Sequence, residues 1–157
     1  MRIIVVADTH ARTANLKKLC LKQRDADVFI HLGDGIDDID RIREQYTNCS
    51  FITIRGNVDF GSKEPKEKLL VLEEKRIFMT HGHKYGVKTS YDALLNKAKE
   101  QSADILLFGH THAAFYTYAD GVYILNPGSL ELPQRDAPRF GIIDIIDGSI
   151  TAYLAEL

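Results

Sequence analysis

The sequence predicts a mixed α/β layered fold with two β-sheets. Short β-branched strands alternate with helical segments in the first third of the chain, and antiparallel hairpins follow in the last third. A simple doubly wound sheet would continue the first pattern to the end of the chain. The length of 157 residues suits one domain over residues 1–157.

The first third has a strand-helix-strand-helix pattern. Apolar β-branched runs predict strands at 3–7, 27–32 and 51–54. Apolar residues at helical spacing predict a helix over 14–23 and a second helix that begins near Ile36 and is closed by residues 46–48.

The remaining elements are mainly hairpins. The runs 68–72 and 75–80 flank Glu73-Glu74 and predict a hairpin, and Ser90 is the expected cap of the helix that follows. Another buried strand is predicted at 104–108. Four more strands, with turns at Asp120-Gly121 and Asp147-Gly148, are predicted at 114–119, 122–125, 140–146 and 149–154.

Composition and charge exclude several classes of protein. Hydrophobic residues make up 45% of the chain and charged residues 27%, which disfavours disorder, and no apolar run is long enough to span a bilayer. The formal charge of -2 lacks the basic excess expected of a protein that binds long duplex nucleic acid. Cys20 and Cys49 are isolated, so we expect free thiols and a cytoplasmic location.

Side chains able to bind a metal follow the predicted strands. Each lies just past the carboxyl end of a strand, which is the edge where α/β sheets bind ligands. The residues are Asp8, His10, Asp34, Asn57, His81, His110 and His112. Each alone is also explained by a turn, a helix cap or a core hydrogen bond. Together they indicate a pair of divalent cations, because imidazole and carboxylate suit such ions and seven ligands require one carboxylate to bridge.

These blocks resemble the calcineurin-like metallophosphoesterase superfamily, specifically its small single-domain bacterial and archaeal phosphodiesterases. The resemblance rests on Asp8-Thr9-His10, Gly33-Asp34, Gly56-Asn57, His81-Gly82-His83 and Gly109-His110-Thr111-His112. It implies that Asp8, His10 and His112 hold one metal, that Asn57, His81 and His110 hold the other, and that Asp34 bridges them. It also implies a four-layer αββα sandwich, in which two stacked mixed sheets are flanked by helices.

The expected chemistry is phosphoester hydrolysis at a binuclear centre. The metals would lower the pKa of a bridging water, and the resulting hydroxide would attack phosphorus in line with the leaving group. Asn57 is expected to act both as a ligand and as a hydrogen-bond donor to the phosphate. The resemblance suggests manganese, and zinc, nickel, iron or cobalt suit the same ligands.

Val58 departs from the pattern of many phosphatases in the superfamily, which have a histidine there to protonate the leaving oxygen. General acid catalysis is typically worth about 10²–10⁴-fold, so its loss favours diesters with good leaving groups. His83 is the obvious substitute donor, and a role in orienting a metal ligand is equally compatible with its position. The alternative functions are a phosphomonoesterase that uses His83 as its acid, and a non-catalytic interaction scaffold similar to a trafficking-coat subunit of the superfamily.

Several other residues are given supporting or ordinary roles. We interpret His31 as structural or as orienting a ligand, and Asp59 as orienting a ligand or capping a turn. Asn126-Pro127-Gly128-Ser129 predicts a tight turn, which the resemblance places beside the histidine loop. The cations near the expected rim are interpreted as ordinary surface residues: Arg12, Arg55, Lys84 and Arg135.

The expected partners are a small phosphoester substrate and further copies of the chain. No cap or insertion that would select a substrate is visible in the sequence, so an open site is expected. Aromatic residues at strand spacing late in the chain predict a homo-oligomer: Phe115, Tyr116, Tyr118 and Tyr123.

Overall fold

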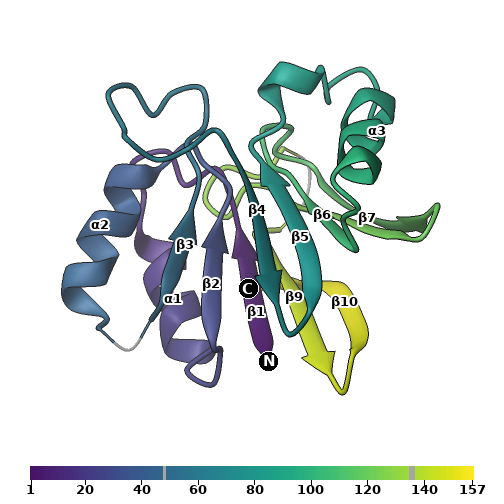
Figure 1. Ribbon diagram of the computed structural model, residues 1–157. Helices are drawn as coiled ribbons and strands as arrows, with labels where there is room; N and C mark the ends of the chain where they lie inside the picture. The colour runs from purple at the N-terminus through teal and green to yellow at the C-terminus, as the bar shows by residue number, and fades with distance from the viewer. Residues whose placement is uncertain (48, 135–136) are drawn as a thin grey trace.

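The computed structural model describes residues 1–47, 49–134 and 137–157, which form two five-stranded sheets and three α-helices (Figure 1). The first sheet has the order β10-β9-β1-β2-β3. Strands β1, β2 and β3 are parallel, and the two late strands pair antiparallel. The strand bounds are β1 Arg2–Val6, β2 Val28–His31, β3 Phe51–Thr53, β9 Arg139–Ile146 and β10 Ser149–Glu156.

The second sheet is also mixed and has the order β4-β5-β6-β8-β7. Its three central strands are parallel, and its two edge strands pair antiparallel with their neighbours. The bounds are β4 Glu67–Leu72, β5 Lys75–Thr80, β6 Ile105–Leu107, β7 Ala114–Ala119 and β8 Val122–Pro127. The predicted pair of sheets is therefore confirmed.

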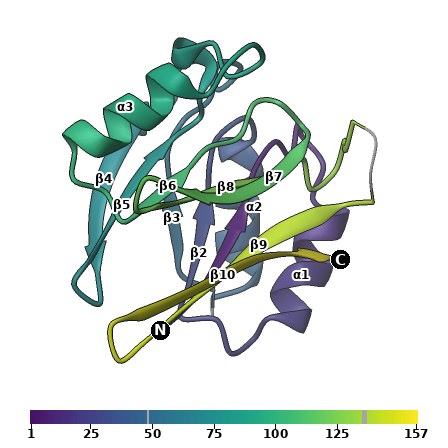
Figure 2. The ribbon, with the colours of Figure 1, turned by 90° about the vertical axis from the view of Figure 1, so that its right-hand side faces the viewer.

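Alternation along the strands explains the layers. In β1, Ile3 and Val5 pack into the core between the sheets, whereas Ile4 and Val6 face helices α1 (Ala14–Lys22) and α2 (Ile36–Gln45). The outer face of the second sheet is covered by α3 (Asp92–Glu100). Figure 1 shows the resulting order of helices, sheet, sheet and helix, and Figure 2 shows the molecule from the side of α3.

Two local predictions need correction. Helix α3 begins at Asp92 with Tyr91 as its cap residue, although the Ser90 hydroxyl accepts a hydrogen bond from the Asp92 N–H. Strand β8 continues through Asn126 and Pro127, so the turn begins only at Gly128, whose φ is 76°. Proline is tolerated there because β6 pairs with β8 only as far as Leu125, so no ladder bond from that side is lost.

The hairpin turns in the last third are confirmed. Asp120 and Gly121 have φ of 52° and 82°, and Asp147 and Gly148 have φ of 47° and 76°. Positive φ at both central residues is the mark of a type I′ turn, which matches the twist of the flanking strands.

Two residues named in the sequence predictions, Asn48 and Arg135, lie outside the residues that the structure describes. None of the described helices combines the length and apolar character needed to cross a membrane.

The parallel strands of both sheets direct their following loops to one edge of the sandwich. Hydrogen bonds join these loops within each sheet: the Asp8 N–H donates to the Gly33 carbonyl at 3.0 Å, and the Gly109 N–H donates to the His81 carbonyl at 3.2 Å. The His110 N–H donates to Asp8 Oδ2 at 3.0 Å and joins the loops of the two sheets. The edge is therefore a continuous surface built from both sheets.

Candidate metal centre

The loops after β1, β2, β5 and β6 bring together two groups of side chains that could each hold a cation. In each group one candidate ligand atom per residue lies within 4.8 Å of the others. The outer group consists of Asp8, His10 and His112, and the inner group of Asp34, His81 and His110. Six of the seven predicted ligands lie in these groups.

The outer group is arranged around two imidazole nitrogens. His10 Nε2 and His112 Nε2 are 3.0 Å apart, and Asp8 Oδ1 lies 3.8 Å from the first and 3.4 Å from the second. Two nitrogens bound at about 2.0–2.1 Å to one zinc-sized ion lie roughly 3 Å apart, so this pair fits a shared cation. The Nδ1 atom of His112 donates to the Leu132 carbonyl at 3.2 Å, which directs Nε2 toward the group.

In the inner group three hydrogen-bond acceptor atoms lie close together. His81 Nδ1 donates to the Leu32 carbonyl at 2.7 Å, so in the neutral ring Nε2 is an acceptor. That atom nevertheless lies 3.2 Å from Asp34 Oδ2 and 3.1 Å from Asn57 Oδ1. Three acceptors this close require a proton or a cation between them. Asn57, the seventh predicted ligand, thus reaches the inner group.

The two groups are contiguous. Asp8 Oδ1 lies 4.0 Å from His81 Nε2, and this oxygen is buried with no hydrogen-bond partner among the described residues. An unpaired buried carboxylate oxygen is costly unless a cation faces it. The donor set of carboxylate, imidazole and amide oxygen therefore fits a pair of divalent ions.

The charges in the groups shift the pKa values of their members. Burial opposes ionisation of Asp34, but His81 outweighs it and holds the Asp34 pKa at about 2. Burial likewise opposes protonation of His81, and Asp34 and Asp8 raise its pKa all the same. For His110, burial and the neighbouring His81 lower the pKa to about 4. The carboxylates of Asp34 and Asp8 thus create a field that favours positive charge at His81.

Five candidate ligands have a left-handed backbone. The φ values are 56° at Asp8, 48° at His10, 59° at Asp34, 69° at His110 and 56° at His112. This region is uncommon for residues other than glycine, and such strain concentrates at functional sites. The adjoining glycines are needed for space, since a Cβ on Gly33 would lie 2.4 Å from Gly56 N. The loops are therefore built to aim these side chains inward.

Asp59 holds the Asp34 loop and caps α2 at the same time. Its carboxylate accepts hydrogen bonds from the N–H groups of Asp34, Gly35, Ile36 and Gly56 at 2.7–3.0 Å. Burial would raise the Asp59 pKa, but these donors together hold it below its usual range. The interpretation of Asp59 as orienting a ligand fits these contacts, whereas its carboxylate caps α2 and not the turn that follows it in the sequence.

Sequence analysis missed Asp38 and Thr9. Asp38 is buried on α2 and accepts hydrogen bonds from Thr9 Oγ1 at 2.6 Å and from the Ala11 N–H at 2.9 Å. It therefore fixes the loop that carries Asp8 and His10. The spacing could have revealed it: Asp38 lies four residues before Ile42, so both side chains lie on the same, apolar side of α2.

His31 connects the loops beneath the two groups. Its Nδ1 accepts a hydrogen bond from the Gly33 N–H at 3.2 Å, so its Nε2–H faces Thr9 Oγ1 at 3.4 Å. Complete burial lowers the His31 pKa to about 4, so the ring is neutral. The histidine is a support for both loops.

The block at 126–129 contacts the loop that carries His110 and His112. The Asn126 amide donates to the Gly109 carbonyl at 2.9 Å and to Thr111 Oγ1 at 3.0 Å. Ser129 Oγ donates to the Asp8 carbonyl at 2.7 Å. These contacts place the block beside the centre as a support.

His83 and Val58 lie at the margin of the inner group. The His83 ring centroid is 5.5 Å from that of His81 and 6.1 Å from that of His110. Its Nδ1 is buried and has no hydrogen-bond partner among the described residues. The Val58 N–H donates to Asp34 Oδ1 at 3.0 Å, and its side chain is partly exposed.

Comparison with known proteins identifies relatives of the whole chain. The probable metallophosphoesterase YsnB of Bacillus subtilis is 29% identical over 96% of this chain and 88% of its own length. The phosphodiesterase MJ0936 of Methanocaldococcus jannaschii is 27% identical over 92% of this chain and 93% of its own.

Solved structures share the fold. A predicted phosphoesterase of Streptococcus pneumoniae superposes with a TM-score of 0.84 at 24% identity, over 99% of this chain and 88% of that one. Vps29 of Entamoeba histolytica, solved with Zn²⁺, gives a TM-score of 0.76 at 22% identity, over 99% and 98%. Residues 1–148 match the calcineurin-like phosphoesterase superfamily domain, and the chain therefore belongs to that superfamily.

Proposed function

We propose that this protein is a metal-dependent phosphodiesterase. The observation that carries the proposal is that two separate cavities border the contiguous ligand groups. One cavity, of about 310 Å³, is lined in part by His10 and Asp34, and the other, of about 420 Å³, by His110 and His112. A phosphodiester has two organic groups on phosphorus, one for each cavity, whereas a monoester has only one.

The ligand set proposed for two cations follows the two groups. Asp8, His10 and His112 would hold one ion, Asn57, His81 and His110 the other, and Asp34 would be shared between them. Divalent ions bound there would supply Lewis acidity, which activates water and offsets the charge of the phosphoester. We propose manganese as the activating ion, with zinc, nickel, iron and cobalt as alternatives that the same ligands accept.

The protein's own groups would orient the ester. The Leu32 and Leu132 carbonyls fix the tautomers of His81 and His112, so that their Nε2 atoms face the centre. Asn57 Oδ1 faces His81, which leaves its amide N–H groups to donate to a phosphoryl oxygen. The Val58 side chain cannot supply a proton, which favours esters with good leaving groups.

The test is hydrolysis of bis-p-nitrophenyl phosphate beside p-nitrophenyl phosphate. The protein is stripped with a chelator, and Mn²⁺, Ni²⁺, Zn²⁺ or Mg²⁺ is added back separately. We expect metal to restore cleavage of the diester in preference to the monoester. A fully metal-loaded protein inert toward both esters would overturn the proposal and favour the scaffold alternative.

A phosphomonoesterase is the second candidate, and the unpartnered His83 beside the inner group favours it. In that case His83 would donate a proton to the leaving oxygen. The His83→Gln variant would then lose activity on phenyl phosphate, a poor leaving group, far more than on p-nitrophenyl phosphate. Equal losses on the two monoesters would instead indicate that His83 orients a ligand.

We also propose that the protein is a homo-oligomer. Tyr116 and Tyr118 are exposed on β7, an edge strand of the second sheet. Light scattering that detects only a 17.7 kDa species would contradict this proposal. The organisation as one domain and the cytoplasmic location stay predictions.

A further inference from the structure

We propose that the cavity beside His10 and Asp34 binds an aromatic group of the substrate, and that Phe60 is the residue that selects it. The inference rests on the proposed function, because it assumes that phosphorus lies at the metal centre. It adds the chemical class of the group esterified to the phosphate: one that carries a planar aromatic ring, such as a nucleoside or an aryl group, in preference to an alkyl chain.

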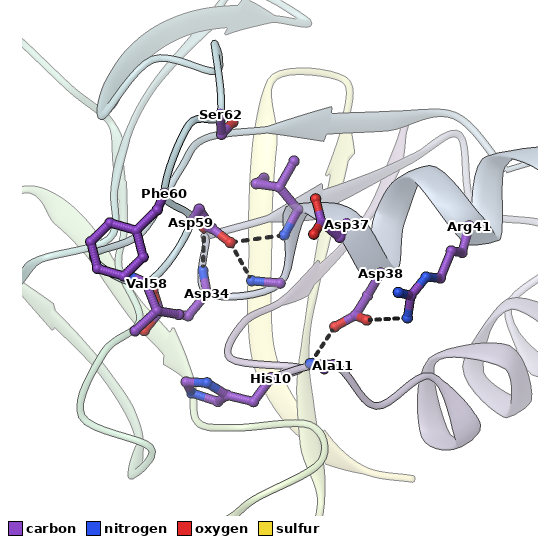
Figure 3. A pocket seen from close by; sticks show the side chains of 12 residues that line it. His10, Ala11, Asp34, Asp37, Asp38, Arg41, Val58, Asp59, Phe60 and Ser62 are labelled. Atoms are coloured by element: carbon purple, nitrogen blue, oxygen red, sulfur yellow. Dashed lines mark hydrogen bonds and ion pairs between the residues drawn. The ribbon is translucent and has the colours of Figure 1, made fainter.

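The position of the cavity connects it to the chemistry. It begins at His10 and Asp34 and extends across the first turns of α2 to Arg41 (Figure 3). Its volume of about 310 Å³ is at the small end of the 300–1,000 Å³ usual for ligand sites. A phosphate at the centre would therefore place one compact organic group inside it.

An apolar wall borders the end of the cavity nearest the centre. Phe60 is 88% exposed and Val58 is 43% exposed, and both line the cavity. Figure 3 shows the Phe60 ring beside Val58 and on the same side as His10. Isolated exposed apolar residues are ordinary, but two on one loop that border a polar metal centre form an apolar surface for a ligand.

The loop that carries these side chains is held firmly. Asp59, between them, accepts the four backbone hydrogen bonds described above, and the Val58 N–H is bound to Asp34 Oδ1. The Phe60 N–H donates to the Val58 carbonyl at 2.9 Å. Because the loop backbone is already ordered, little conformational entropy is lost when a ring stacks on Phe60.

The far end of the cavity is charged. Asp37 is exposed on α2, and the Arg41 guanidinium lies 3.8 Å from the buried Asp38 carboxylate. Figure 3 shows Arg41 at the opposite end from Phe60. An occupant should therefore present a flat apolar face to Phe60 and polar substituents to the far end, which a base or a substituted aryl group provides.

The test compares two ligands that differ only in the aromatic ring. Adenosine 5′-monophosphate and ribose 5-phosphate are titrated by calorimetry into the Mn²⁺-loaded protein. We expect the first to bind about tenfold more tightly, since stacking of a base on an aromatic side chain is usually worth between a few-fold and a hundredfold. In Phe60→Ala the ratio should fall to about one, whereas Phe60→Tyr should keep it.

The control is Tyr153→Ala, which removes an exposed aromatic ring from β10 that does not line the cavity. It should leave the ratio unchanged. Phe60 is so exposed that its alanine variant should keep the thermal stability of the wild type. Equal binding of both ligands by the wild type would overturn this inference. It would leave the proposed function standing, provided that the protein still cleaves the diester. Binding of neither phosphate would count against the proposed function as well.

Discussion

The inner and outer ligand groups differ in how firmly the protein holds them. In the inner group the His81 side chain is 0% exposed and that of Asp34 is 3% exposed, and both are fixed by backbone groups. His110, the third inner residue, is half-buried. In the outer group Asp8 is as buried as His81, but the side chains of His10 and His112 are 22% and 27% exposed. Preorganised, buried ligands lose less freedom on binding a cation. We therefore expect the inner group to retain its ion when a chelator has already removed the outer one.

The shared carboxylate provides the most severe test of this comparison. Asp34→Asn removes a charge that both proposed ions need, so kcat/KM for bis-p-nitrophenyl phosphate should fall at least about 10³-fold, equivalent to several kcal/mol of transition-state stabilisation. Metal content measured by elemental analysis should fall for both ions. Asp40→Asn, an exposed carboxylate on α2, is the control and should behave as the wild type. Loss of a single ion would show that Asp34 belongs to the inner group alone.

The loops of both groups depend on the neutral ring of His31. The folded state holds its pKa near 4, below the ordinary 6.5, so the unfolded chain binds a proton first as the pH falls. The stability due to the neutral ring is present above pH 6.5 and is lost between pH 6.5 and 4, by about 3 kcal/mol.

His31→Asn lacks this titration. In the chelated protein, the stability advantage of the wild type over this variant, measured by urea unfolding, should therefore shrink as the pH falls through this range. An advantage that stays constant from pH 7 to 4 would show that His31 is not the titrating group.

The position of the ligands was predictable because it depends on local sequence. Asp8 and His81 directly follow apolar strands, and parallel strands bring their carboxyl ends to one edge. The support from Asp38 was not predictable, since its contact with Thr9 joins α2 to the loop after β1 and forms only when the layers pack. The same holds for Phe60, because its exposure depends on the loop that Asp59 anchors.

Asp59 tests whether the rigidity of the inner group comes from its backbone. In Asp59→Asn one carboxylate oxygen becomes an NH₂ group that faces N–H donors, so we expect a loss of about 2 kcal/mol in unfolding free energy. Metal affinity of the inner group should weaken about 10–100-fold, as for other residues that orient ligands. Asp40→Asn again serves as the control. If only the metal affinity of the outer group weakened, Asp59 would not be the residue that holds the inner ligands in place.

Ser129 tests the outer group, with the smallest expected effect. Its hydroxyl donates to the Asp8 carbonyl and accepts from the Leu132 N–H at 2.8 Å, and the Leu132 carbonyl in turn orients His112. Ser129→Ala should therefore cost about 1–2 kcal/mol of stability through two lost buried hydrogen bonds. In a Mn²⁺ titration with two binding events, only the weaker event should shift, by less than about tenfold. An equal shift of both events would mean that a change in the outer loop alters the metal affinity of both groups. The firmer hold on the inner ligands would then not make their affinity independent of the outer group.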